Sequence, residues 1–144
     1  ASELGAARET VYSYMHFLEK TYFISLLAPF SRSIDGEVRG AKKVYFCDGG
    51  LLNYLGKIPD GVIFENAIFL NLRKYGLLNY YAKYKGPEVD FILNKKIALE
   101  AKNKADGFDI KRLARVCKNV HIKEYYLVVN AFTRSSKSIL AQDL

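Results

Sequence analysis

Cysteine is scarce in this sequence, and neither Cys47 nor Cys117 belongs to a C-x-x-C pair. Both lie in apolar surroundings, so the pattern predicts buried, reduced thiols and a cytoplasmic protein. The sequence also lacks an apolar run long enough to cross a bilayer, and no signal-peptide pattern opens it. We therefore expect no membrane partner. No internal repeat is present, and the one biased segment is the polar tail after Asn130.

Apolar and basic residues, by contrast, are plentiful. Of the 144 residues 50% are hydrophobic, with 11 Tyr and 9 Phe, a composition that builds a core. The length suits one ordinary domain, or one domain with a small appendage. The formal net charge of +7 points to an anionic partner, for which nucleic acid is the leading candidate.

Residues 1–50 have the pattern of a partial winged helix-turn-helix. Apolar residues at three- and four-residue spacing predict a helix over 7–22, and two apolar segments predict strands over 23–30 and 42–47. The polar, glycine-containing segment 31–40 predicts an exposed, mobile loop. We expect residues 24–26 to pair with 44–46. The expected phosphate contacts of this part are Arg8, Arg32, Arg39, Lys42 and Lys43.

Residues 51–144 predict a second unit, of the α/β class. A helix is expected over 62–75 with Asp60 as its cap, followed by strands over 77–84, 88–93 and 97–102. A further helix begins at Asp106 or Asp109 and runs to about residue 118, and a strand follows over 125–129. This order packs most naturally as a mixed sheet flanked by helices.

Glu65 is the first candidate site residue, because its helical neighbours Val62, Ile68 and Phe69 are all apolar. A carboxylate in such a setting is costly unless it has a cation, a proton or a hydrogen-bond partner. One interpretation is an ion pair with Arg73, Lys74 or a distant lysine. The other is a role in a site completed by the following strands.

The strands over 88–93 and 97–102 carry charged residues at alternate positions. Glu88 and Asp90 share a face of the first strand, and Glu100 and Lys102 share a face of the second. A two-residue turn would set the charged faces on opposite sides, whereas a three-residue loop at 94–96 sets Asp90 opposite Glu100. Only this kind of register buries both apolar faces together.

Two carboxylates side by side destabilise a hairpin unless a cation neutralises them. We therefore expect Asp90 and Glu100 to share one cation, with Glu65 directed at the same spot. All-oxygen ligation favours Mg²⁺ or Mn²⁺, which can bind a phosphate oxygen and deliver hydroxide from bound water. Lys102 would orient that water or stabilise the transition state. The alternative is a sheet held by salt bridges alone.

The helix after the third strand has a basic face formed by Lys111, Arg115 and Lys118. One interpretation is a solvated face that has no role in binding. The other is a ridge beside the metal site that follows the phosphates of a nucleic acid, releasing counterions at each contact.

The segment Pro87-Glu88-Val89-Asp90, followed by Glu100-Ala101-Lys102, resembles the signature of the PD-(D/E)xK phosphodiesterases, the restriction-endonuclease-like superfamily. That family's core order of helix, three strands, helix and strand matches residues 61–129. The resemblance implies that Asp90 and Glu100 are metal ligands and Lys102 the catalytic lysine. It also makes Glu65 the acidic residue of the first core helix. The sequence departs from the signature by two residues inserted between Pro87 and Asp90.

A closer resemblance, over almost the whole chain, is to a domain of unknown function that follows a P-loop ATPase module in many archaeal and bacterial proteins. It is carried by the segment V-Y-F-C-D-G-G-L at 44–51, by Phe64-Glu65-Asn66 and by Glu88-Val89-Asp90-Phe91. No G-x-x-x-x-G-K-[ST] motif is present. We therefore expect this chain to be the C-terminal part of a longer polypeptide whose ATPase module is not included here.

The sequence favours a restriction-endonuclease-like domain over 51–144, preceded by a partial winged helix over 1–50. Its leading function is a Mg²⁺-dependent DNA phosphodiesterase that acts as the effector end of an ATPase, since Glu65, Asp90, Glu100 and Lys102 are all intact. Two alternatives remain open. One is a non-catalytic module that binds DNA or regulates the ATPase, and the other is a module that positions the ATPase on a protein partner.

Overall fold

The computed structural model describes residues 5, 7–31, 33–131 and 135–144. The elements, in chain order, are α1 (Arg8–Lys20), β1 (Ile24–Leu27), α2 (Ile34–Arg39), β2 (Lys43–Phe46), α3 (Gly49–Tyr54), α4 (Asp60–Leu72), β3 (Leu78–Ala82), β4 (Glu88–Leu93), β5 (Ile97–Lys102), α5 (Gly107–Val120), β6 (Glu124–Val129) and β7 (Ser138–Leu140). Short 3-10 turns follow α4 at Arg73–Tyr75 and β7 at Ala141–Asp143. The strands expected over 88–93 and 97–102 have these bounds in the structure.

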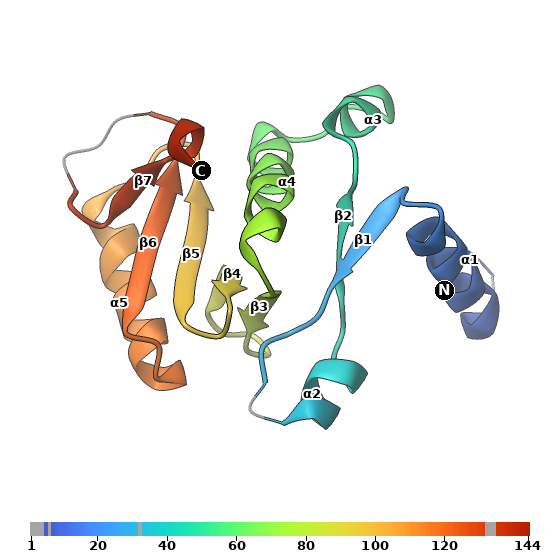
Figure 1. Cartoon of the computed structure of the whole chain (residues 1–144), viewed down its shortest axis with the longest axis horizontal. Helices are drawn as coiled ribbons and strands as arrows, with labels where there is room; N and C mark the ends of the chain where they lie inside the picture. The colour runs from blue at the N-terminus through green and yellow to red at the C-terminus, as the bar shows by residue number, and fades with distance from the viewer. Residues whose placement is uncertain (1–4, 6, 32, 132–134) are drawn as a thin grey trace.

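The main sheet has the strand order β3-β4-β5-β6-β7. Strands β3, β4 and β5 pair antiparallel, whereas β5, β6 and β7 pair parallel, so the sheet is mixed. Helix α5 contacts β4 and β6, and α4 contacts β4 and β5 from the other side (Figure 1). The expected α/β class, a mixed sheet flanked by helices, is confirmed.

Each face of this sheet carries its own hydrophobic cluster. One includes Phe91 and Leu99 with Ile68, Phe69 and Leu72 of α4. The other is built on the α5 side and includes Val89, Ile92, Ala98, Leu113, Val116 and Cys117. Helix α4 also contacts β2 and α3, so apolar residues outside its sheet-facing side are covered in part.

The N-terminal hairpin packs on α4 rather than standing apart. Strands β1 and β2 pair antiparallel with Ile24 opposite Phe46, which confirms the pairing expected for residues 24–26 and 44–46. The Tyr45 ring stacks on Phe69 of α4 with 4.3 Å between ring centroids. The chain after β1 also bonds to the main sheet, where Tyr80 N–H donates to the Ala28 carbonyl at 3.1 Å. The boundary expected between residues 50 and 51 falls inside α3, and both sides of it share one core.

The prediction of a loop over 31–40 is wrong for most of that segment, which forms α2. The Ser33 hydroxyl accepts a hydrogen bond from the Gly36 N–H and so caps the helix. Serine side chains make the same kind of bond in turns, so the pattern suits a loop as well as a helix. An ion pair between Asp35 and Arg39, one helical turn apart, adds to it.

Three further differences concern short elements. Asp60 is the first residue of α4 rather than its cap, and that place is taken by Pro59. Helix α3 was not expected; it is capped by Asp48, whose side chain accepts from the N–H groups of Gly50 and Leu51. The predicted polar tail contains β7, which pairs with β6 at the edge of the sheet.

The cysteine and membrane expectations can be checked on the described residues. Cys117 is buried, Cys47 is half-buried, and both are free thiols. Among the helices of the described ranges, none combines the length and the apolar character that crossing a membrane requires.

Replacement of Asn66 by Ala is expected to lower the free energy of unfolding by about 2–4 kcal/mol. The buried Asn66 side chain accepts from the Phe46 N–H at 2.8 Å and donates to the Phe46 carbonyl at 3.1 Å, so its loss leaves two groups of β2 without these partners. Urea denaturation measures the change. The control is Asn71→Ala on the exposed side of the same helix, expected to change stability by less than about 1 kcal/mol. Equal effects of the two changes would contradict a special role of Asn66.

Candidate functional site

The turn between β4 and β5 has the length that the sequence predicted. Residues 94–96 connect the strands, with Asn94 and Lys95 in the left-handed region at φ 50° and 59°. The pairs Leu93–Ile97, Ile92–Ala98 and Phe91–Leu99 follow, which is the register that a three-residue loop predicts for this part of the hairpin. The predicted register is therefore confirmed for these pairs.

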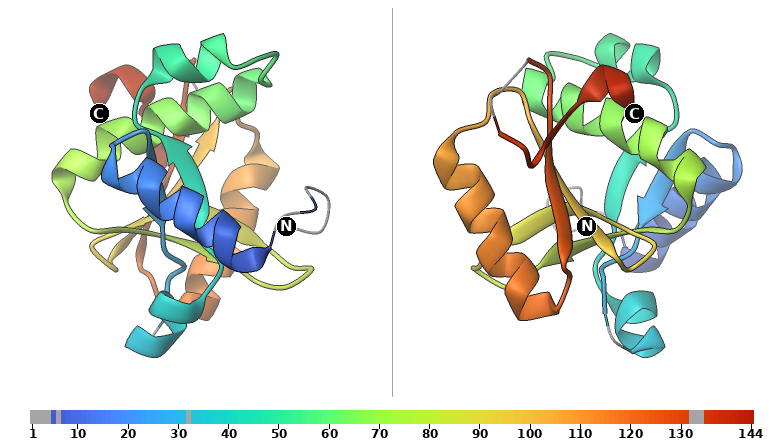
Figure 2. Two further views of the ribbon diagram at one scale, coloured as in Figure 1. Left: turned by 90° about the vertical axis from the view of Figure 1, so that its right-hand side faces the viewer. Right: turned by 60° about the vertical axis from the view of Figure 1, so that its left-hand side comes forward.

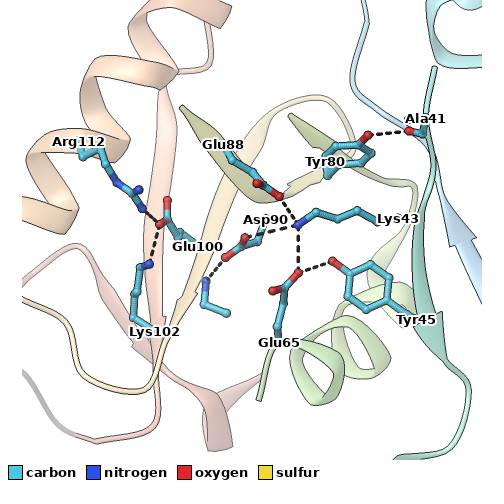
Figure 3. Close-up of polar contacts among 11 residues, drawn as sticks. Ala41, Lys43, Tyr45, Glu65, Tyr80, Glu88, Asp90, Glu100, Lys102 and Arg112 are labelled. Atoms are coloured by element: carbon cyan, nitrogen blue, oxygen red, sulfur yellow. Dashed lines mark hydrogen bonds and ion pairs between the residues drawn. The ribbon is translucent and has the colours of Figure 1, made fainter. Parts of the chain in front are cut away.

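A β-bulge in β4 redirects Asp90. The register of β4 against β3 shifts between Asn79 and Tyr81. As a result Val89 and Ile92, three positions apart, both belong to the cluster on the α5 side, which a regular strand does not allow. Bulges re-aim side chains in this way. Asp90 points toward Lys43 of β2 and Glu65 of α4, whereas strict alternation would place it on the face of Ile92 (Figure 3).

Three carboxylates surround the ammonium of Lys43, the first residue of β2 (Figure 3). Lys43 Nζ lies 3.1 Å from Glu65 Oε1 and 3.7 Å from Asp90 Oδ1, and it also bonds to Glu88. The Lys43 side chain is 24% exposed and that of Asp90 17%. These side chains, together with Tyr45, are called the Lys43 group below. Its three carboxylates face one ammonium, so it has a net negative charge when all are ionised.

Tyr45 fixes Glu65 from the same strand. Its hydroxyl donates to Glu65 Oε1 at 2.6 Å, the oxygen that also accepts from Lys43. Burial and the Glu65 carboxylate raise the pKa of the Tyr45 hydroxyl far above its usual range, so it stays a proton donor. The expectation that a distant lysine can pair with Glu65 is confirmed, and Lys43 is that lysine.

The charges of the Lys43 group act on one another's protonation. Burial lowers the pKa of Lys43, but the bond to Glu88 and the charges of Glu65 and Asp90 outweigh it, so its pKa lies above the ordinary value. Burial has the largest effect on Asp90, and together with the charge of Glu65 it raises the pKa of this carboxyl to about 6. The Lys43 ammonium and the hydrogen bond from the Ala101 N–H act in the opposite direction and lower it. Lys43 therefore offsets only part of the repulsion at Asp90.

Glu100 lies in a separate set of contacts, called the Glu100 group. Its Oε1 accepts from Arg112 of α5 and lies 3.2 Å from Lys102 Nζ. The residue is 3% exposed, and among the described residues its Oε2 is a buried oxygen without a hydrogen-bond partner. A buried carboxylate oxygen of this kind is costly and calls for an explanation.

The two groups meet through the backbone of β5. The Ala101 N–H, next to Glu100 in the chain, donates to Asp90 Oδ2 at 3.0 Å. Glu65 and Asp90 meet at Lys43, as expected, whereas Glu100 pairs with Arg112 and Lys102, so a cation shared by all three carboxylates stays a prediction. Glu100 faces α5 as a regular strand residue does, whereas the bulge turns Asp90 toward α4 (Figure 3).

Sequence reasoning missed Arg112 and Tyr45 as site residues and assigned Lys43 elsewhere. A signal for Lys43 was available, because residues two apart in a strand share a face and Tyr45 is buried. Arg112 carries a weaker signal: it is next to the buried Leu113 on the helix that faces Glu100. Nothing in the sequence marks the bulge that separates Asp90 from Glu100.

The expected nucleic-acid contacts do not form one surface. Arg8 is on α1 with its guanidinium over the Tyr12 ring, Arg39 pairs with Asp35, and Lys42 is exposed. Lys43 is engaged in its own group, and Arg32 lies outside the described residues. Lys111, Arg115 and Lys118 are exposed on α5, on the opposite side of the molecule from α1 (Figure 1).

A divalent cation fits these residues in part. The buried, unpartnered Glu100 Oε2 and the raised pKa of Asp90 are what a missing positive charge would leave behind. Within the described ranges, however, no three His, Cys, Asp or Glu side chains stand as a ready set of metal ligands. Lys43 lies between Glu65 and Asp90, and Glu100 is turned to Arg112. Glu65, Asp90 and Glu100 could hold a metal ion only after Lys43 withdraws and Glu100 turns.

Comparison with known proteins adds one match. A family model described as "Domain of unknown function (DUF8612)" matches residues 1–61, which span α1 to the start of α4. No curated protein and no solved structure matches the chain significantly. Lys43 and Tyr45 lie within the matched segment, whereas the carboxylates of the candidate site, Glu65, Glu88, Asp90 and Glu100, lie outside it.

Replacement of Asp90 by Asn is expected to raise the free energy of unfolding at pH 7.5, by up to roughly 3 kcal/mol. A carboxyl with an ordinary pKa of 3.8 and a folded-state pKa of about 6 favours folding in its protonated form. This contribution is fully present below pH 3.8 and is lost as the pH rises through 6. The gain from Asp90→Asn should therefore shrink to near zero at pH 4. Denaturant titrations across pH 4–8 measure it.

The control for this prediction is Glu124→Gln, since Glu124 is exposed at the start of β6. Its effect should stay within about 0.5 kcal/mol at every pH. If Asp90→Asn instead destabilises the protein at pH 7.5, the attraction of Lys43 for Asp90 outweighs the burial and repulsion described above.

Proposed function

We propose that this chain is a restriction-endonuclease-like α/β domain that hydrolyses DNA phosphodiester bonds with Mg²⁺ or Mn²⁺. In this proposal it acts in the cytoplasm as the C-terminal effector of a P-loop ATPase module in the same polypeptide. The mixed sheet with α4 and α5 on its two faces is compatible with that fold. The winged-helix assignment of residues 1–50 is supported by the helix α1 followed by the β1–β2 pair.

The observation that carries the proposal is the excess of buried carboxylate oxygen along β4 and β5. Glu100 Oε2 is buried without a hydrogen-bond partner. Burial and the nearby Glu65 carboxylate disfavour the ionised form of Asp90 and so raise its pKa. Both carboxylates border the Ala101 peptide, one by chain connectivity and one through the hydrogen bond from the Ala101 N–H. Buried carboxylates that lack sufficient counter-charge are the usual setting for a hard cation.

The residues of the chain have defined parts in this reaction. A bound Mg²⁺ or Mn²⁺ would activate water and offset the charge of the phosphate. Glu65, Asp90 and Glu100 would hold the ion. Lys102 is one-third exposed and beside Glu100, so its ammonium can reach a phosphate oxygen or orient the attacking water. Arg112 now holds the Glu100 carboxylate through Oε1, so Glu100 would turn from Arg112 to bring its unpartnered Oε2 to the ion.

The exposed residues Lys111, Arg115 and Lys118 lie on the same helix as Arg112. A phosphate backbone that enters beside Lys102 would meet this helix next. Each contact there adds affinity without base specificity and makes binding weaker at high salt. The N-terminal residues Arg39 and Lys42 would contact a different part of the nucleic acid.

A second candidate is a non-catalytic module that binds DNA or regulates the ATPase, or that docks the ATPase on a protein. The Lys43 group favours it, because the ammonium already neutralises part of the charge that a metal ion would neutralise. In that case Glu65, Glu88 and Asp90 are a partly buried ion network that holds β2 on the sheet.

The test is cleavage of single-stranded, duplex and branched DNA with Mg²⁺ or Mn²⁺. Lys102→Met should keep Mn²⁺ binding but lower the cleavage rate on the order of 100-fold or more, because the ammonium acts mainly in the transition state. Glu100→Gln should lose both Mn²⁺ binding and cleavage. Calorimetry measures binding, and gel assays measure cleavage.

The matched control is Lys104→Met, because Lys104 is exposed and removes the same charge two residues further along the chain. It should change cleavage less than threefold. A wild-type chain that neither binds Mn²⁺ nor cuts any of the three DNA forms would sink the nuclease proposal and leave the non-catalytic module.

A further inference from the structure

The Lys43 ammonium lies among three carboxylates, and it comes from a different part of the fold than they do. It is the first residue of β2 in the N-terminal hairpin, whereas Glu65 is on α4 and Asp90 on β4. Its ammonium contacts three carboxylates and lies 5.4 Å from the centre of the Tyr80 ring. The hairpin thus supplies the one described cation in contact with Glu65 and Asp90.

We propose that the Lys43 ammonium and the divalent cation compete for Glu65 and Asp90, so that the position of the β1–β2 hairpin sets the metal affinity of the site. This inference rests on the proposed function, since it concerns the same metal. Two cations a few ångströms apart in a partly buried site repel strongly, and Glu65 Oε1 and Asp90 Oδ1 can face only one of them at a time. Withdrawal of Lys43 is therefore a condition of metal binding.

Glu88 is the carboxylate with which Lys43 can remain paired when a metal ion binds. It is the most exposed of the three carboxylates at 46%, against 27% for Glu65, and it stands at the start of β4. It is not among the expected metal ligands. An outward turn of the Lys43 side chain can keep its bond to Glu88 while giving up Glu65 and Asp90. The ammonium then lies nearer the surface, where a DNA phosphate can also accept from it.

The main chain of the hairpin does not have to unfold for this exchange. Tyr45 stays anchored by its stacking on Phe69, and the Phe46 backbone by its two bonds to Asn66. Lys43 precedes both anchors at the end of the strand, on a flexible four-carbon side chain. A DNA phosphate that pairs with the outward Lys43 would favour binding of the metal ion. By reciprocal linkage, the bound metal ion would favour binding of the phosphate.

The experiment is a calorimetric Mn²⁺ titration of the chain and of Lys43→Met at pH 7.5. Loss of the competing ammonium should tighten Mn²⁺ binding by on the order of tenfold or more. The Mn²⁺-induced rise in the thermal unfolding midpoint should increase in parallel. Lys42→Met, which removes the same charge from the exposed neighbouring residue, should bind Mn²⁺ within threefold of the original chain.

A second variant guards against misfolding, because Lys43→Met leaves three carboxylates without their cation. Lys43→Met combined with Glu88→Gln removes one charge of each sign and leaves Glu65, Asp90 and Glu100 in place. It should fold and still bind Mn²⁺ more tightly than the original chain. Lys43→Arg keeps the competing charge and should bind Mn²⁺ no more tightly than the original.

The outcomes distinguish the two proposals. Tighter binding in both Lys43→Met variants, with no change in Lys42→Met, supports the competition. Binding of Mn²⁺ that is equal or weaker in these variants overturns it while leaving the metal site itself intact. Absence of Mn²⁺ binding in every folded variant overturns the metal site and the competition together.

Discussion

The arrangement of the molecule depends on one electrostatic constraint: Glu65, Glu88 and Asp90 come from α4 and β4 and need positive charge close by. The chain meets that need internally with Lys43, and in doing so it ties β2 to the main sheet. The tie acts together with apolar packing, because Tyr45 two residues further along stacks on Phe69 and bonds to Glu65. The hairpin strand β2 lies against α4 in this arrangement (Figure 2).

Helix α4 is the element through which these demands are combined. Its inner side packs on the sheet with Ile68, Phe69 and Leu72, while Glu65 and Asn66 meet β2. The sheet covers one side of the helix, and β2 and α3 cover part of another, so its apolar residues extend beyond the single stripe of a surface helix. The candidate site is consequently not a feature of the sheet alone, and residues of the first fifty positions belong to it.

Much of the fold follows from patterns in the sequence. Strands β4 and β5 follow from alternating apolar residues and from the length of the turn at 94–96. Helix α5 follows from Asp106, which caps it in a reciprocal arrangement with Asp109. The partnership of Glu65 with a distant lysine also follows from the cost of burying a carboxylate. These features are local, or rest on a single strong energetic demand.

The features that escaped prediction depend on contacts distant in sequence. The bulge beside Asp90 places Val89 and Ile92 in one cluster on the α5 side, an arrangement that the alternation of residue types in β4 does not predict. Helix α2 was not predicted because Ser33 and Gly36 suit a loop equally well. The contacts that stabilise it are the Ser33 cap and the ion pair of Asp35 with Arg39. Arg112 was not expected at the site because the face of α5 that meets Glu100 is fixed by packing.

The distance in sequence between Lys43 and its partners has a consequence for the order of folding. Strands β3, β4 and β5 are joined by short turns and can associate early, because closing short loops costs little entropy. Contacts between Lys43 and Asp90 close a much longer loop and form late. Until they do, Glu65, Glu88 and Asp90 have no contact with Lys43, so the nascent sheet carries unbalanced negative charge that resists collapse onto α4. Docking of β2 then offsets part of that repulsion, because it brings the Lys43 ammonium into contact with all three carboxylates.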